Sequence, residues 1–205
     1  MADDAGERTS ARQDRSEATR KQILDAAVQC FAKQGYDRTS TAAIAKAAGV
    51  SQGIIFHHFA TKEGLFSAVL RTGIDGFKDC LNKAEQSHLA PAEKIQFLLR
   101  LMGEMAMAES SRTEIIIRQL FQVQLDPEMV EASGIMGVIS TIRDAFEEGR
   151  QSGAFGEIDT QTAALSILGI YLANYVGWSA LGKSYDFPHA LQRGCSMFLE
   201  GVTRR

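Results

Sequence analysis

The segment from Thr39 to Phe66 constrains the fold most, because short apolar helical patterns alternate in it with turn residues. Ser40 or Thr41 can cap a first helix, since a hydroxyl oxygen accepts a hydrogen bond from an otherwise unpaired main-chain amide. The apolar face of that helix is predicted from Ile44, Ala45 and Ala48, and the turn after it from Gly49 and Val50. Glycine readily takes the left-handed conformation that ends a helix. The segment therefore predicts two short helices joined by a tight turn.

The second helix of this segment carries the side chains that suit DNA. Ser51 is its predicted cap, and Ile55 and Phe59, four residues apart, form its buried face. The remaining positions lie on or beside the outer surface: Gln52, Gly53, Ile54, Phe56, His57 and His58. A helix that exposes amide and imidazole groups, with a glycine near its start, fits the major groove.

The helical period also dominates the rest of the chain, which predicts an all-α fold of about nine helices. Leu24, Ala27, Val28 and Phe31 form an apolar stripe that predicts a helix over residues 16–34, ended by Gly35. The further predicted helices span approximately residues 62–86, 91–108, 113–123, 126–152, 160–181 and 188–204.

Three regions are expected along the 205 residues: a mobile arm at 1–14, a helix-turn-helix DNA-binding domain at 15–61, and a larger helical regulatory and dimerisation domain at 62–205. The net charge is −3, but its distribution is uneven. Residues 15–62 hold seven Lys and Arg against three Asp and Glu, whereas residues 63–205 hold thirteen against eighteen. The positive charge is therefore concentrated where the helix-turn-helix lies, as contact with phosphates requires.

The run from about Arg15 to Leu70 resembles the DNA-binding domain of the TetR-type transcriptional repressors. The resemblance rests on RKQILDAAVQCFAKQGYDRTS before the turn and FHHFATKEGLFSAVL after it. The rest of the chain is similar to that family only in length, helical content and layout. Two positions depart from the family pattern: Phe56 stands where a tyrosine is usual, and Ala43 where an acidic residue often completes the helix cap.

Each residue of the expected DNA site has a chemical role. Gln52 can pair with the N6 and N7 edge of adenine, and Ile54 can contact a thymine methyl group. Gly53 allows the helix backbone to approach the groove closely. The hydroxyls of Ser40, Thr41 and Ser51 are candidate phosphate contacts as well as caps. His57 can contact a base or a phosphate, and the family resemblance implies phosphate contacts for His58 and Lys62.

The C-terminal region is expected to hold an apolar or aromatic effector and a dimer interface. Thioethers and large rings could line a pocket, or could equally form a filled core; these residues are Phe97, Leu101, Met102, Met105, Phe121, Tyr171, Tyr175 and Trp178. The last two helices resemble the four-helix dimer interface of the family, through Leu165, Leu168, Leu172, Met197, Phe198 and Val202.

Catalytic and cofactor motifs do not stand out in the sequence, so we expect no enzyme activity, no cofactor and no metal site. The neighbouring His57 and His58 point about 100° apart on a helix, which disfavours shared metal binding. Cys30, Cys80 and Cys195 are widely spaced and read as reduced thiols. With no secretory signal and no apolar run approaching ~20 residues, a cytoplasmic location is expected.

Together these features predict a homodimer that binds a palindromic operator in double-stranded DNA as a repressor. A small apolar or aromatic effector would release it. Two-fold symmetry is needed because one short helix reads too few bases to be selective. Two alternatives stay open: a DNA-binding regulator with no small-molecule ligand, and a helical enzyme or adaptor with a degenerate helix-turn-helix.

Overall fold

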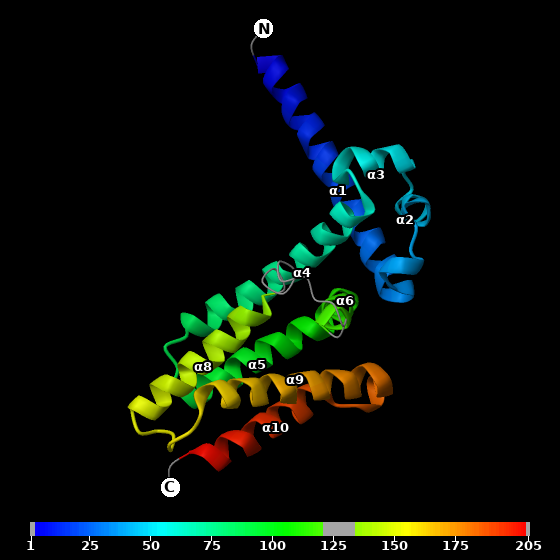
Figure 1. Cartoon of the computed structure of the whole chain (residues 1–205). Coiled ribbons are helices and arrows are strands. Elements are labelled where there is room, and N and C mark those ends of the chain that lie inside the picture. The colour runs from blue at the N-terminus through cyan, green and yellow to red at the C-terminus, as the bar shows by residue number, and fades with distance from the viewer. Residues whose placement is uncertain (1–2, 121–133, 204–205) are drawn as a thin grey trace. The chain divides into compact units, whose positions relative to one another are not determined.

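The computed structural model describes residues 3–120 and 134–203 (Figure 1). The chain divides into two compact units: unit 1 holds residues 1–73 and 111–122, and unit 2 holds residues 74–110 and 123–205. Across the described ranges the chain forms nine α-helices and one short 3-10 helix, and its one β-type pairing is an isolated bridge between Phe155 and Thr203. The prediction of an all-α fold is confirmed.

Unit 1 is built around the helix-turn-helix. Its helices are α1 (Asp3–Arg38), α2 (Thr41–Ala48), α3 (Gln52–Phe59), the first part of α4 (Lys62–Glu85) and α6 (Ser110–Leu120). The predicted apolar stripe of α1 is buried, as are Ile44, Ile55 and Leu65 from the three following helices. This shared core fixes the short helices α2 and α3, which are too short to be stable alone.

Helix α1 begins earlier than its apolar stripe predicts. The stripe places the start near residue 16, with a mobile arm before it, whereas the helix extends back to Asp3. Residues 3–15 contain no proline, and seven of these thirteen residues are Ala, Glu, Arg or Gln, which favour helix. The predicted break at Gly35 is confirmed, because Gly35 leaves the helical conformation (φ 77°, ψ 170°). One further turn then extends to Arg38.

Helix α6 belongs to unit 1, although the sequence assigned all residues after 61 to the regulatory domain. Arg112 forms an ion pair with Asp25 of α1 at 2.8 Å. Arg118 donates a hydrogen bond to the main-chain oxygen of Ala32 at 3.0 Å. Sequence periodicity could not predict these contacts, because they join residues 86 and 87 positions apart.

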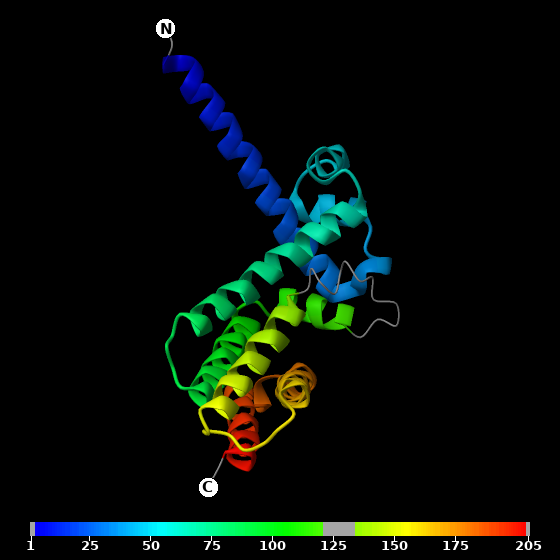
Figure 2. The ribbon, with the colours of Figure 1, turned by 60° about the vertical axis from the view of Figure 1, so that its left-hand side comes forward.

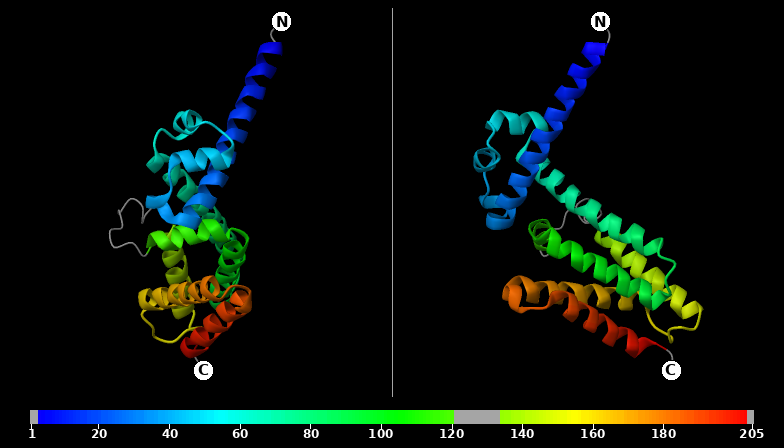
Figure 3. Two further views of the ribbon diagram at one scale, coloured as in Figure 1. Left: turned by 90° about the vertical axis from the view of Figure 1, so that its right-hand side faces the viewer. Right: turned by 180° about the vertical axis from the view of Figure 1, so that it is seen from behind.

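Unit 2 consists of the rest of α4 together with α5 (Pro91–Ala108), α8 (Ile135–Gln151), α9 (Thr160–Leu181), the 3-10 helix η1 (Gly182–Ser184) and α10 (Phe187–Val202). Helix α9 packs against α8 and α10, and α5 packs against the same two helices. Figures 2 and 3 show α9 (orange) beside α10 (red). The predicted start of a helix at Asp126 lies outside the described residues.

Helix α9 is more apolar than the sequence analysis allowed. Among the described residues it is the one helix with the length and composition of a membrane span, with a mean hydropathy of 1.4. This corrects the expectation that no apolar run approaches that length. Helix α9 packs on both α8 and α10, which is one reason for apolar residues on more than one of its faces.

The three cysteines are free, as predicted. Cys80 and Cys195 are buried, and Cys30 is half-buried. Burial raises the pKa of the Cys80 thiol, and raises the pKa of Cys195 to about 12. Both buried groups are therefore neutral thiols at neutral pH.

Candidate nucleic-acid interface

The turn between α2 and α3 has the geometry that the sequence predicts. The Ser40 hydroxyl caps α2 by accepting a hydrogen bond from the amide of Ala43 at 3.1 Å. Gly49 ends the helix in the left-handed conformation (φ 65°, ψ 29°). The amide of Val50 then donates to the carbonyl oxygen of Ala45 at 3.0 Å, which closes the turn. One hydroxyl and one glycine thus set where the two helices begin and end.

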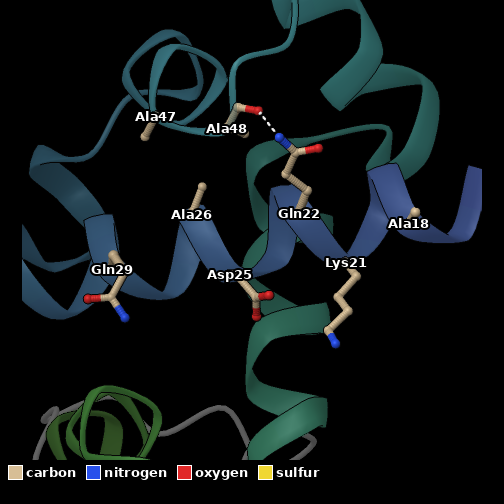
Figure 4. Close-up of a pocket in the computed structure, with 8 residues that line it drawn as sticks. All are labelled: Ala18, Lys21, Gln22, Asp25, Ala26, Gln29, Ala47 and Ala48. Atoms are coloured by element: carbon tan, nitrogen blue, oxygen red, sulfur yellow. Dashed lines mark hydrogen bonds between the residues drawn. The ribbon is translucent and has the colours of Figure 1, made fainter.

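Helix α2 is also held in place by α1. The side-chain amide of Gln22 donates a hydrogen bond of 2.8 Å to the carbonyl oxygen of Ala48, which has no partner within its own helix. Figure 4 shows this bond at one side of an open groove between α1 and α2. The groove is lined by Ala18, Lys21, Gln22, Asp25, Ala26, Gln29, Ala47 and Ala48. Alanines on both helices allow this close packing, so α2 has a fixed position in unit 1.

Helix α3 buries one face and opens the other. Ile55 is fully buried and Phe59 is 7% exposed, as predicted. On the opposite side Gln52, Gly53, Ile54, Phe56 and His57 are exposed, and His58 is half-buried. Ser51 takes the cap position but makes no capping hydrogen bond through its side chain. Its hydroxyl is therefore available to an outside partner.

Gln52 is not free in this structure. Its side-chain amide donates a hydrogen bond of 2.7 Å to the hydroxyl oxygen of Thr41, at the start of α2. The two residues are eleven positions apart, and no local sequence pattern predicts that they pair. The bond aligns the amide of Gln52 with the first turn of α2, so two of the expected DNA-contacting groups are held together before any DNA binds.

Two apolar side chains of α3 are open to solvent. Ile54 is 38% exposed and Phe56 is 44% exposed. Exposure of large apolar groups is expected where they contact a partner. An aromatic ring at position 56, where the family usually has a tyrosine, could have been part of the core. The ring lies on the outer surface.

The two histidines differ in environment. The pKa of His58 is lowered below its usual value by burial, by the neighbouring His57 and by the positive charge of Arg20. Arg20 lies on α1, with its guanidinium carbon 5.1 Å from the centroid of the Phe59 ring. The apolar stripe of α1 does not predict this cation, because Arg20 lies outside the stripe. In the described part of the chain no three His, Cys, Asp or Glu side chains converge on a possible metal position.

A strained turn joins α3 to α4. Ala60 has a positive φ (60°, ψ −49°), and the amide of Thr61 donates to the carbonyl oxygen of Phe59 at 2.7 Å, which makes a γ-turn. The hydroxyl of Thr61 then caps α4 by accepting from the amide of Gly64 at 2.9 Å. A side chain at Gly64 would collide with the carbonyl oxygen of Phe59. Only a residue without Cβ fits there.

The first turn of α4 is anchored on an aromatic ring of α1. Tyr36 packs against Phe31 and Phe66, and its hydroxyl donates a hydrogen bond of 2.8 Å to the Glu63 carboxylate. Burial and this carboxylate raise the pKa of Tyr36 to about 12. Lys62 places its ammonium over the same ring. Tyr36 therefore positions the lysine that the sequence analysis named as a phosphate contact.

In unit 2, three of the predicted effector residues are brought together around a fourth ring. Tyr171, Tyr175 and Trp178 of α9 all contact Phe187, the first residue of α10. Trp178 stacks on Phe187 with centroids 5.5 Å apart. Phe187 was missed because it lies between Asp186 and Pro188, in a stretch that reads as a turn.

The other predicted effector residues differ in burial. Met102 is buried, whereas Phe97, Leu101 and Met105 are half-buried. Phe121 lies outside the described residues. The thioether of Met105 lies against the backbone of α4 at Gly76, since a Cβ there would sit 2.9 Å from its sulfur.

The predicted dimer residues do not all face the same way. Leu165 and Met197 are 48% and 65% exposed. Leu172, Phe198 and Val202 are half-buried. Leu168 is 8% exposed and lies in the core of unit 2, so it differs from the prediction. Val176, which the prediction omitted, is 52% exposed and continues the line of Leu165 and Leu172 along α9.

Comparisons with known proteins agree with this geometry. The family described as "Bacterial regulatory proteins, tetR family" matches residues 23–69. The chain is 33% identical over 144 residues to YvkB of Bacillus subtilis, described as an uncharacterized HTH-type transcriptional regulator, covering 62% of this chain and 74% of that protein. The chain therefore belongs to the TetR family and is a DNA-binding transcriptional regulator.

Two solved structures share the fold over almost the whole chain. The fatty acid degradation regulator FadR from Bacillus halodurans has a TM-score of 0.75 at 26% identity, with 91% of this chain and 97% of that chain covered. FadR from Bacillus subtilis, solved in complex with stearoyl-CoA, has a TM-score of 0.74 at 22% identity, with 89% and 98% covered.

Proposed function

We propose that the chain acts as a homodimeric repressor that binds a palindromic operator through α3 of each protomer and leaves it when an apolar effector binds in unit 2. The observation that carries the DNA half is the two-sided character of α3. Ile55 is fully buried, whereas Gln52, Ile54 and Phe56 on the other side are exposed. A helix seated in a core by one face and open on the other can enter a major groove.

The groups around α3 divide into base-reading and phosphate-binding sets. Gln52 supplies an amide for adenine once it leaves Thr41, and Ile54 offers an apolar surface for thymine. Lys62 and His58 bind phosphate, and Arg20 adds a further cation beside His58. Phosphate contacts orient the helix, and base contacts select the sequence.

The proposed dimer interface consists of exposed apolar side chains on α9 and on the neighbouring helix α10. Leu165, Leu172 and Val176 recur at helical spacing, and a Cβ at Gly169 between them would meet nothing within 4 Å. Met197 presents an exposed thioether on α10. An isologous pairing of these two helices would remove this apolar surface from water.

We propose an acyl thioester as the effector. An aliphatic or aromatic ketone is the alternative effector class. Support comes from the ring cluster of unit 2, which surrounds Phe187 with apolar surface. It also comes from the shared fold with a regulator that was solved with stearoyl-CoA. Because the partner is genomic DNA and the three cysteines are free thiols, we place the protein in the cytoplasm.

Reciprocal titrations test this proposal. The operator is first selected from a random DNA pool, and the protein is then titrated with operator in the presence and absence of lauroyl-CoA. The reverse titration measures the affinity for lauroyl-CoA with and without operator. Free coenzyme A is the control ligand. Linkage requires the two affinities to fall by the same factor. A DNA pool that yields no preferred sequence would refute sequence-specific DNA binding. Affinities that do not change when the other component is present would refute the proposed effector.

A further inference from the structure

One buried polar atom in unit 2 has no partner. Tyr171 is 2% exposed, and its hydroxyl makes no hydrogen bond with any described residue. Buried side-chain polar atoms are nearly always paired, because leaving one unpaired costs its desolvation energy. A phenylalanine at this position would avoid that cost. The hydroxyl therefore needs an explanation other than packing.

The groups that the structure places near this tyrosine are an aromatic ring, a phenol and a thiol. The Tyr171 ring meets the edge of Phe187 at 6.1 Å between centroids. Burial is the main cause that raises its pKa, followed by the nearby ionisable groups Tyr175 and Cys80. Burial also raises the pKa of the Cys80 thiol, which is therefore neutral at pH 7. A charged ligand group would be poorly solvated here, whereas a neutral acceptor would not.

The walls near this hydroxyl can move. Gly76 on α4 lies one turn before Cys80, and the space over it is occupied by the thioether of Met105. Gly103 on α5 lies against Leu191 and Phe187. A methionine changes rotamer at little cost, so Met105 can leave the surface of Gly76 and open space one turn from Cys80, a neighbour of Tyr171.

We propose that the Tyr171 hydroxyl is the polar anchor of the effector site, where it donates a hydrogen bond to the carbonyl oxygen of a neutral, otherwise apolar ligand group. This inference rests on the proposed function and narrows its ligand class. The thioester carbonyl of an acyl-CoA and the carbonyl of a ketone share this chemistry. The anchor selects molecules with an acceptor at one point of an apolar body and rejects plain hydrocarbon.

Removal of the hydroxyl alone tests the anchor. Tyr171→Phe deletes one oxygen and keeps the ring. The matched control is Tyr185→Phe in the same unit, where the hydroxyl already donates to the side-chain oxygen of Asn174 at 2.5 Å. Without any ligand, Tyr171→Phe should keep or raise the melting temperature, since an unpaired group is removed, whereas Tyr185→Phe should lower it. A loss in Tyr171→Phe as large as that in Tyr185→Phe would overturn the inference.

Paired probes then test the ligand chemistry. Lauroyl-CoA is compared with S-dodecyl-CoA, a thioether without the carbonyl oxygen, and tridecan-2-one is compared with its methylene isostere 2-methyltridec-1-ene. Wild-type protein should prefer the carbonyl member of one pair by roughly two- to tenfold, the effect of one hydrogen bond. The preferred pair identifies a thioester or a ketone. Tyr171→Phe should bind both members of that pair equally, and Tyr185→Phe should keep the preference.

Two failures remain distinguishable. Wild-type binding of the probes with no carbonyl preference, or a preference that persists in Tyr171→Phe, overturns the anchor and leaves the proposed function in place. Wild-type protein that binds its operator but none of the four probes overturns the effector half of the proposed function, and the anchor with it.

Discussion

The ammonium nitrogen of Lys62 lies 4.1 Å from the centroid of the Tyr36 ring, so a cation at the start of α4 is held on an aromatic face supplied by α1. The next residue, Glu63, accepts the hydrogen bond of the same tyrosine. A cation held this way loses less conformational freedom when it binds a phosphate. The pairing also links the end of α1 to the beginning of the helix that leaves unit 1.

Lys62→Ala should weaken binding to all DNA sequences alike. It removes one phosphate contact, so the slope of log affinity against log salt should become shallower by about one. Gln52→Ala should instead relax preference at one base position, at about 1–3 kcal/mol of discrimination. Fluorescence anisotropy at several salt concentrations, with operator and scrambled duplexes, measures both. A change of sequence preference in Lys62→Ala with an intact salt slope would contradict these roles.

Gly53→Ala should separate DNA binding from stability. A Cβ at this position would meet only the Ser51 hydroxyl at 3.8 Å, so the fold has room for it. Alanine should therefore stabilise α3 by about 0.5–1 kcal/mol. If the backbone approaches the groove closely, the same methyl group should weaken operator binding. Thermal melting and operator titration of one variant give both readings, and unchanged operator affinity would mean that the glycine does not face the DNA.

Phe56→Tyr should tighten DNA binding. The ring is already 44% exposed, so a hydroxyl can be added without burial. One added hydrogen bond to phosphate contributes about 0.5–1.5 kcal/mol. Melting temperature should not change, which serves as the internal control. Weaker binding by a normally folded variant would show that the ring edge contacts an apolar part of the DNA instead.

Ala60→Gly should raise the stability of unit 1. A positive φ in an alanine costs roughly 1–3 kcal/mol, and glycine removes most of that cost while losing some unfolded-state advantage. The expected net gain is about 1 kcal/mol in chemical denaturation. Ala47→Gly, at an exposed position of the regular helix α2, should lose a similar amount.

Gly64→Ala is the complementary test of the same turn. Its methyl group would collide with the Phe59 carbonyl oxygen, so the turn must open and both stability and DNA affinity should fall. A neutral result for Ala60→Gly together with a tolerated Gly64→Ala would mean that the turn in solution is not the strained one described here.

DNA affinity should increase as the pH falls from 8 towards 6. The pKa of His58 is lowered in the free protein, mainly by burial, so the imidazole is neutral at pH 7. A phosphate beside it raises that pKa, and binding then takes up a proton. For folding the sign is opposite: the lowered pKa means that His58 costs stability as the pH falls below about 6.5. Operator titrations of wild type and His58→Gln should differ in pH dependence, and identical profiles would exclude this role.

The sequence by itself determined the helices and the helix-turn-helix. Pro91 and Asp159 mark helix starts that the structure reproduces, and Ser40 and Gly49 fix the ends of α2, because caps and turns depend on neighbours within a few residues. The charge of residues 15–62 likewise follows from composition alone. These local features predict an all-α DNA-binding protein, and the resemblance of the run from about Arg15 to Leu70 adds the TetR type.

Only the tertiary structure decided which side chains meet. Gln52 bonds to Thr41, Lys62 lies over Tyr36, and Phe187 joins the rings of α9, although the partners lie on different helices. Periodicity identifies the apolar face of a helix, but it does not determine which neighbour covers that face. The same limit explains why Leu168 is buried in its own unit while Val176 is exposed. These contacts depend on the packing of whole helices, which no short stretch of sequence specifies.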